Sequence, residues 1–166
     1  MPAESRTFTF ESLPQNVEEL KAMPEADFSS PFATAALVIA ALNRYEKSPK
    51  DCIDMLNYLR QPRPMSVYEQ QFLRDRLGGK AYVPRSYFAG TSPQNDYTPT
   101  MPYTVTISAG PYAFNTEGYA TLTVVSSGAD SPRQIQMRAK GGTVWYWWEN
   151  FLLPDIRIPV SMDPWA

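Results

Sequence analysis

The spacing of apolar residues changes once along this chain, and the change predicts two halves with different secondary structure. Up to Leu77, apolar side chains recur about every three to four residues, which is the repeat of a helix with one buried face. From Tyr103 onward they recur every second residue, which is the repeat of a strand with one buried face. The first half therefore predicts helices, and the second half predicts an antiparallel sheet.

Residues that start helices stand at regular intervals in the first half. Ser30 and Ser48 each precede a proline, so the serine can cap a helix while the proline occupies its first turn. Ser66 is followed three residues later by a glutamate, which is the spacing of a capping box. Asn16 can cap a shorter helix. Three to four helices are predicted, and no convincing strand precedes them.

Four consecutive segments after residue 102 are predicted to be strands. In the first three, apolar residues alternate with threonine, serine, glutamine or arginine. The four segments are YTVTISAG, GYATLTVVSSG, RQIQMRAK and TVWYWWENF. The pair Gly141 and Gly142 predicts a tight hairpin between the last two. Because the apolar face of such a sheet must be covered, the predicted fold class is α+β, with an N-terminal helical layer packed on a C-terminal antiparallel meander of four or more strands.

The whole chain, residues 1–166, is predicted to form a single domain, since its length suits one hydrophobic core. We expect a helical part at about 14–78 and a sheet part at about 103–160. The segment between them, about 79–102, is rich in proline, tyrosine and asparagine and has no clear period. It predicts a long ordered loop.

Charge and hydropathy restrict the partners and the compartment. Fifteen basic and seventeen acidic residues give a net charge of −2, so no general field attracts a polyanion, and we expect no nucleic acid partner. The longest apolar run, residues 33–42, is about half of the roughly 20 residues that cross a bilayer. The N-terminus does not resemble a signal peptide. We expect a cytoplasmic protein with no membrane partner, if no leader has been removed from it.

The residue inventory excludes most catalytic chemistry. The chain has no histidine, which removes Ser-His and Cys-His pairs and histidine metal ligands. It has one cysteine, Cys52, which the helical pattern predicts to be a buried small hydrophobe. No phosphate loop and no dinucleotide-binding motif is present in the sequence. We therefore predict no metal site and no cofactor.

The run WYWW, Trp145 to Trp148, is the most unusual stretch of the chain. In a regular strand, Trp145 and Trp147 point to one face while Tyr146 and Trp148 point to the other. One pair then belongs to the core between sheet and helices. The other pair lies on the opposite face of the sheet and requires its own explanation.

Two interpretations of the outer rings, Tyr146 and Trp148, are open. In the first, the C-terminal segment or the tyrosine-rich loop covers them, which we favour because large aromatic side chains are usually buried. In the second, they form an exposed platform beside Gln136 and Arg138 for a sugar, a base or a partner protein. These four residues are the predicted ligand-binding or partner-binding site.

Two functions follow from this surface. The preferred one is a non-enzymatic binding or protein-interaction module that uses an aromatic face of the sheet. Its partner is a protein, a second copy of the chain, or a small molecule that the sequence does not identify. The alternative is a small carboxylate-dependent hydrolase or isomerase with a pocket near the tryptophan-rich strand. Glu149 and Asp155 are its candidate acid pair. No catalytic residue is assigned in the preferred function.

Several longer stretches resemble a known family. They are YVPRSYFAG, SSGADSPR, ENFLLPDIRIPVSMDPWA and LPQNVEELKAMPEADFSSPFATAALVIAALNRY. With these stretches the chain resembles an uncharacterised bacterial family of similar length, a domain of unknown function. The resemblance implies a self-standing domain, and it supplies no activity and no catalytic residues.

Overall fold

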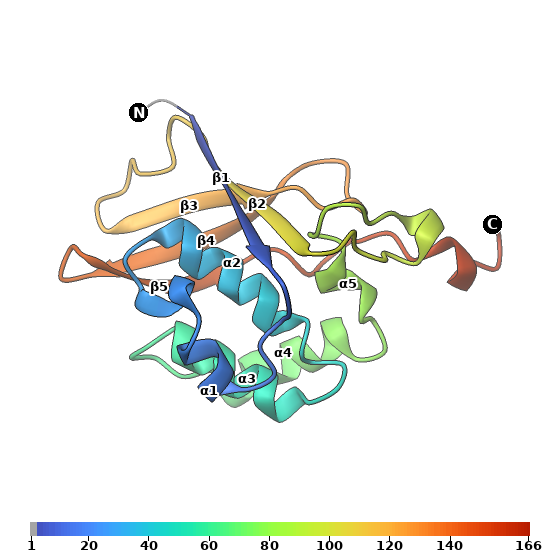
Figure 1. Ribbon diagram of the computed structural model, residues 1–166, viewed down its shortest axis with the longest axis horizontal. Helices are drawn as coiled ribbons and strands as arrows, with labels where there is room; N and C mark the ends of the chain where they lie inside the picture. Colours follow the sequence, from blue (N-terminus) through green and yellow to red (C-terminus); the bar gives the residue numbers. More distant parts are fainter. Residues whose placement is uncertain (1–2) are drawn as a thin grey trace.

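The computed structural model describes residues 3–166, in which a five-stranded antiparallel sheet is covered on one face by helices (Figure 1). The strands follow one another in the sheet in the order β1-β2-β3-β4-β5. Their bounds are β1 Glu4–Phe10, β2 Tyr103–Ala109, β3 Tyr119–Val124, β4 Arg133–Lys140 and β5 Val144–Asn150. The α-helices are α1 Val17–Lys21, α2 Pro31–Leu42, α3 Pro49–Leu59, α4 Val67–Leu77 and α5 Tyr82–Arg85. The α+β class is thereby confirmed.

Strand β1 corrects the prediction that helices precede every strand. It pairs with β2 along its whole length, with Phe8 opposite Val105 and Phe10 opposite Tyr103. Phe10 is buried in the core, and most of the strand is exposed. A short, mostly polar strand at an edge carries little hydrophobic periodicity of its own, so its pairing with a segment far along the chain is not visible in the local sequence.

The predicted helix starts are confirmed by their hydrogen bonds. The Ser30 hydroxyl accepts hydrogen bonds from two backbone N–H groups in the first turn of α2, and the Ser48 hydroxyl accepts one from the Asp51 N–H of α3. Ser66 and Glu69 form both halves of the capping box of α4. Asn16 caps the short α1. The segment predicted as a long loop contains one more short helix, α5, so the described residues form five α-helices and not three or four.

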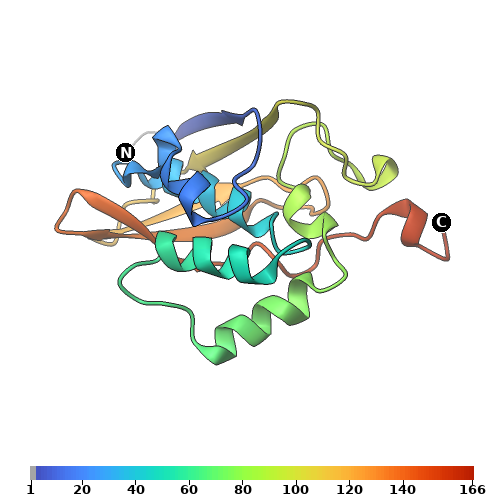
Figure 2. The same cartoon turned by 60° about the horizontal axis from the view of Figure 1, so that its bottom comes forward.

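Helix α2 is the centre of the fold. All twelve of its residues are buried, in agreement with its uniformly small and apolar sequence. It lies between the sheet on one side and α3 on the other, as Figure 2 shows. Alanines on this helix let both neighbouring layers approach closely. Within residues 3–166, no helix is both long and apolar enough to cross a bilayer.

The C-terminal meander forms as predicted. Strands β2 to β5 pair in sequence order, and their inner face is buried against the helices. Ile135 and Met137 of β4 are completely buried, while Arg138 is exposed. Gly141 and Gly142 both have positive φ, 64° and 78°, in the loop that joins β4 to β5. Glycine reaches this left-handed region without the steric cost of a side chain, which explains the pair at this turn.

Cys52 is expected to be inert in the folded protein. Its side chain is fully buried on α3, and burial raises the pKa of the thiol to about 12. A thiol-specific chromogenic disulfide reagent should therefore give no reaction in buffer and one equivalent of reaction in denaturant. Rapid labelling of the native protein would contradict the buried position of this side chain.

Candidate functional site: two clefts beside the tryptophan strand

Strand β5 contains an irregularity at the aromatic run. Met137 of β4 pairs with Trp147, whereas the preceding residue, Gln136, pairs with Glu149. Trp148 is therefore an extra residue without a partner on β4, which is the arrangement of a β-bulge. A bulge interrupts the strict alternation of side chains along a strand. The Trp148 ring nevertheless contacts Arg138 and Tyr119, a cross-strand pair of β4 and β3, so it lies beside Arg138 as predicted.

The inner part of the run belongs to the core. Trp147 is buried with 4% of its surface exposed. The Trp145 ring meets Phe114 edge to face at 6.1 Å. The Trp145 carbonyl accepts a hydrogen bond of 3.1 Å from the hydroxyl of Thr34 on α2. The predicted core position of Trp147 is confirmed.

The outer rings are contacted mainly by arginines and other aromatic side chains. The guanidinium carbons of Arg63 and Arg138 lie 4.0 Å and 4.4 Å from the centre of the Trp148 ring. Tyr146 packs on Phe28 with ring centres 4.8 Å apart. Arg63 also donates a hydrogen bond of 3.1 Å to the Trp148 carbonyl. Cation–π contacts of this kind hold charged groups beside aromatic faces.

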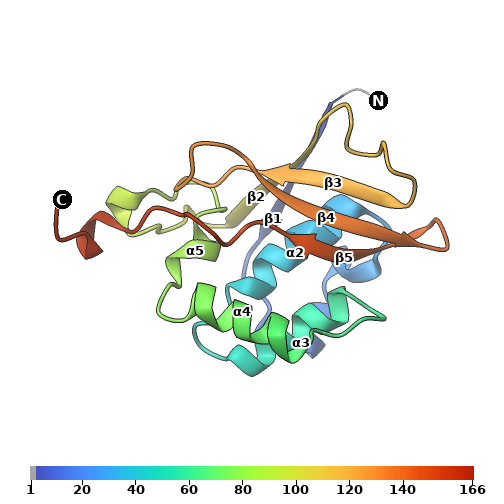
Figure 3. The ribbon, with the colours of Figure 1, turned by 180° about the vertical axis from the view of Figure 1, so that it is seen from behind.

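The C-terminal segment does not cover these rings. Its backbone is held at the other end of the molecule, where the Tyr97 hydroxyl donates to the Arg157 carbonyl over 2.5 Å. Arg157 also forms an ion pair of 2.8 Å with Asp130. Figure 3 shows the C-terminus on the far side from β5. The interpretation that this segment folds back over Tyr146 and Trp148 is therefore wrong.

A cleft of about 460 Å³, which we name the cationic cleft, opens beside Trp148. It lies between the connection from α3 to α4 and the hairpin from β4 to β5. Of the residues that the structure describes, four basic side chains and no acidic one line it. The lining residues are Arg60, Gln61, Pro62, Arg63, Arg138, Ala139, Lys140, Gly141, Tyr146, Trp147 and Trp148.

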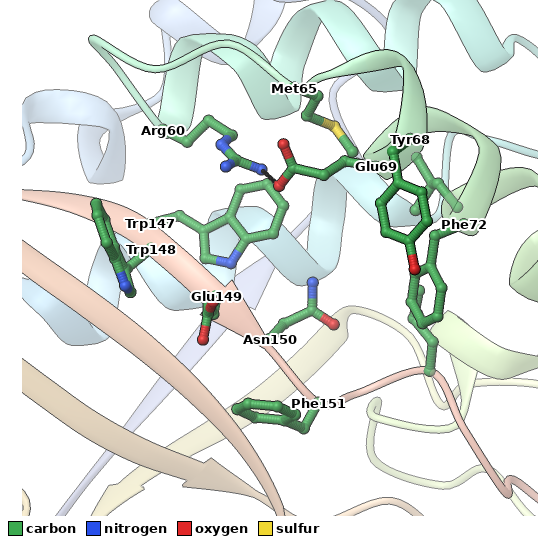
Figure 4. A pocket seen from close by; sticks show the side chains of 12 residues that line it. Arg60, Met65, Tyr68, Glu69, Phe72, Trp147, Trp148, Glu149, Asn150 and Phe151 are labelled. Atoms are coloured by element: carbon green, nitrogen blue, oxygen red, sulfur yellow. Dashed lines mark hydrogen bonds and ion pairs between the residues drawn. The ribbon is translucent and has the colours of Figure 1, made fainter.

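A second cleft of about 270 Å³, the aromatic cleft, lies on the other side of Arg60 and Trp147. Figure 4 shows Tyr68 and Phe72 of α4 along one of its walls and Trp147 along another. Tyr68 is 79% exposed, which is unusual for a large ring. Glu69 and Glu149 also border this cleft, so its character is mixed and not cationic.

Arg60 separates the two clefts. Its side chain is only 2% exposed, and its Nη1 donates to Glu69 over 2.8 Å. Its guanidinium carbon lies 5.0 Å from the centre of the Trp147 ring. Among residues 3–166, the Nε and Nη2 atoms of Arg60 are buried without a hydrogen-bond partner, and so is Nε1 of Trp147. Buried donors without partners are rare and usually have a functional or structural explanation.

The charges around Arg60 favour an ionised Glu69. Burial alone would raise the pKa of this carboxyl, but the Ser66 backbone N–H and the Arg60 guanidinium outweigh burial, and the pKa lies below its ordinary value. The pKa of Arg63 is lowered, first by partial burial and then by the neighbouring Arg60 charge. Positive charges are therefore crowded on the side of Arg60 that faces the cationic cleft. Its anionic partner, Glu69, lies on the side of the aromatic cleft.

The structure brings together three of the four predicted site residues. Tyr146, Trp148 and Arg138 line the cationic cleft. Gln136 does not line it, because its side chain points across the sheet and donates to the Thr121 hydroxyl over 3.4 Å. Arg63, which was not predicted, lines the cleft together with these three residues.

Three basic residues of the site, Arg60, Arg63 and Lys140, were not predicted from the sequence. Arg60 and Arg63 belong to the proline-containing connection RQPRP, and the spacing of basic residues there is the only sequence signal for them. Lys140 precedes the hairpin glycines and appears in sequence as an ordinary strand end. Each becomes part of a site only through the packing of the connection against β5.

The two predicted acids lie in different surroundings. Glu149 borders the aromatic cleft, whereas Asp155 is not among the residues that line this cleft. Asp155 is exposed in a turn with a φ of 60°, and its carbonyl accepts a hydrogen bond from Arg133. Glu69, which is paired with Arg60, lines the same cleft as Glu149.

Fold and site together define an α+β protein with a cationic and aromatic cleft at the edge of an antiparallel sheet. Residues 12–160 match the family model described as Domain of unknown function (DUF6935), and the chain belongs to this family. The resemblance to a domain of unknown function is thereby confirmed. No curated protein and no solved structure matches the chain.

Proposed function

We propose that the protein is a non-enzymatic binding module that takes a small organic anion into the cationic cleft. One observation carries the proposal: four basic side chains and no acidic one line a cleft beside Trp148. Net charge does not account for this arrangement, because the whole chain carries −2. The positive charge is a local feature, and a bound anion would offset the repulsion within it.

The size and walls of the cleft also suit a small ligand. A volume of about 460 Å³ lies in the range typical of small-molecule sites, roughly 300–1,000 Å³. Tyr146, Trp147 and Trp148 supply aromatic surface, while the arginines supply charge. Sites of this composition hold the apolar body of a ligand by burial and its polar group by hydrogen bonds. We infer a ligand with one apolar ring or chain and at least one anionic group.

The composition of the cationic cleft supports binding over catalysis. General acid–base and nucleophilic catalysis need a group that accepts or releases a proton near neutral pH. The cleft lining contains no carboxylate, cysteine or histidine, and its ionisable groups are three arginines, one lysine and one tyrosine. Such a set recognises negative charge and does not by itself supply a base.

Isothermal titration calorimetry with three benzene derivatives tests the proposal. Phenyl phosphate and benzoate carry an anionic group, and benzamide has a similar shape without charge. We expect the two anions to bind and benzamide not to bind. Arg138→Gln should weaken anion binding roughly fivefold, or about 1 kcal/mol, because an exposed charge contributes modestly. Raising the salt concentration should weaken binding further.

Two matched variants control for general charge effects. Arg74→Gln removes an exposed arginine of α4 that does not line the cleft, and it should leave binding unchanged. Glu149→Gln should also leave binding intact, whereas it would abolish turnover in the hydrolase alternative. Equal binding of benzamide and benzoate, or no binding of either anion, would contradict the proposed function.

A further inference from the structure

Among residues 3–166, Arg60 is the only charged residue that is buried. It ends helix α3 as its C-cap, so the helix fixes its backbone. Its guanidinium packs on the Trp147 ring and pairs with Glu69 through Nη1. These contacts hold the side chain in one orientation, yet they satisfy only one of its three nitrogens. The remaining two nitrogens are the feature that the proposed function does not yet explain.

The two free nitrogens form one recognition edge. In a guanidinium group, the N–H bonds of Nε and of the adjacent Nη2 point in the same direction and match two oxygens of a carboxylate or phosphate. Both atoms of this edge in Arg60 are buried, and neither has a hydrogen-bond partner in the part of the chain that the structure describes. Leaving a charged donor edge unpaired in the interior is costly, because water no longer hydrates it. A ligand that completes the edge would recover this cost on binding.

The free edge of Arg60 lies on the side of the guanidinium away from Glu69. Figure 4 shows Nη1 directed at Glu69, which borders the aromatic cleft, while the other two nitrogens are turned away from this carboxylate. Arg60 lines both clefts, but Glu69 lines only the aromatic one. From these positions we infer that the opposite edge of the guanidinium lies on the side of the cationic cleft. Since both nitrogens are buried, a slight outward movement of the cleft wall is needed for an oxygen to reach them.

Resting on the proposed function, we propose that Arg60 selects the ligand by receiving a two-oxygen anionic group, a carboxylate or a phosphate, on its Nε and Nη2 atoms. Arg63 and Arg138 supply the field that attracts the anion. Glu69 is a positioning residue, because it holds Nη1 and thereby turns the free edge towards the cleft. Recognition then depends on the fork geometry of arginine and not on charge alone.

Replacement of arginine by lysine separates geometry from charge. Arg60→Lys keeps the positive charge beside Glu69 and removes the paired donors. It should weaken binding of phenyl phosphate or benzoate by roughly tenfold or more, as loss of a bidentate contact predicts. Arg63→Lys is the matched control in the same cleft and should change binding by less than about threefold. Thermal unfolding of both variants shows whether each one is folded before titration.

A measurement on the unaltered protein avoids dependence on how the variants fold. The Nε–H resonance of Arg60, assigned by its loss in Arg60→Lys, can be followed by ¹H–¹⁵N NMR. On addition of benzoate or phenyl phosphate it should shift downfield and exchange more slowly with water. A purely structural Arg60 would show no such change. Whichever of the two probes binds more tightly identifies the preferred anionic group.

The outcomes distinguish this inference from the proposed function. Binding that depends on Arg138 but is equal in Arg60→Lys and wild type, with an unmoved Arg60 resonance, overturns the role of Arg60 and leaves the binding module standing. Absence of anion binding to the wild-type protein overturns both. Loss of binding in Arg60→Lys together with a shifted resonance supports both.

Discussion

Glu69→Ala is expected to destabilise the protein by about 3 kcal/mol or more, because it leaves Arg60 buried without a counter-charge. The Arg60 side chain is 2% exposed and the Glu69 side chain 35%, so the arginine has little access to water in compensation. The substitution also removes half of the α4 capping box, which adds to the loss. Urea unfolding followed by circular dichroism measures the change.

The same variant has a diagnostic pH dependence. The pKa of Glu69 lies below its ordinary value of 4.5 in the folded protein. Its ionised form therefore stabilises the fold at neutral pH, and this contribution is lost as the pH falls through the lowered pKa. The difference in stability between wild type and Glu69→Ala should narrow in acid. A difference that stays constant down to strongly acid pH would show that the charge of Glu69 is unimportant.

Two further variants define the origin of the effect. Glu69→Gln keeps an oxygen that can accept from Arg60 Nη1, so its loss of stability should be smaller than that of Glu69→Ala. Glu149→Ala removes an exposed carboxylate from the same cleft and should change stability by no more than about 0.5 kcal/mol. If Glu149→Ala and Glu69→Ala were equally destabilising, the Arg60 ion pair would not be the cause.

Ile39→Ala should destabilise the protein by about 2–5 kcal/mol, the range for deleting a large buried aliphatic side chain. Ile39 is completely buried on α2, which packs against the sheet on one side and α3 on the other, so neither layer can close the cavity without disturbing the other. Thermal and urea unfolding both report the loss. Val67→Ala on α4 is the control, since Val67 is 85% exposed and its truncation should have little effect.

The parts of the fold that depend on local sequence were predictable. Helix caps are formed by side chains within three residues of the helix start, so Ser30, Ser48 and Ser66 are recognisable without knowledge of the fold. Alternation of polar and apolar residues likewise identified the first three strands of the meander. The glycine pair then fixed the position of the last hairpin.

The parts that depend on distant contacts were not predictable. The bulge at Trp148 is defined by the pairing of β5 with β4, so the sequence of β5 alone does not reveal it. Arg60 and Arg63 enter the candidate site because the connection after α3 packs beside β5. Among the site residues, the sequence indicated the aromatic strand and Arg138. The contribution of Arg60 and Arg63 to the charge of the cleft could be recognised only from the fold.

The position of β1 has a consequence for how the chain folds. Phe8 pairs with Val105, so β1 waits for a partner strand that is synthesised almost one hundred residues later. Contacts of such long range close slowly, because the intervening chain loses entropy before the contact stabilises it. Until β2 has been synthesised, β1 is a strand without a pairing partner in the nascent polypeptide. Glu4 and Arg6, which carry opposite charges on this strand, give it the polar character that discourages association between nascent chains.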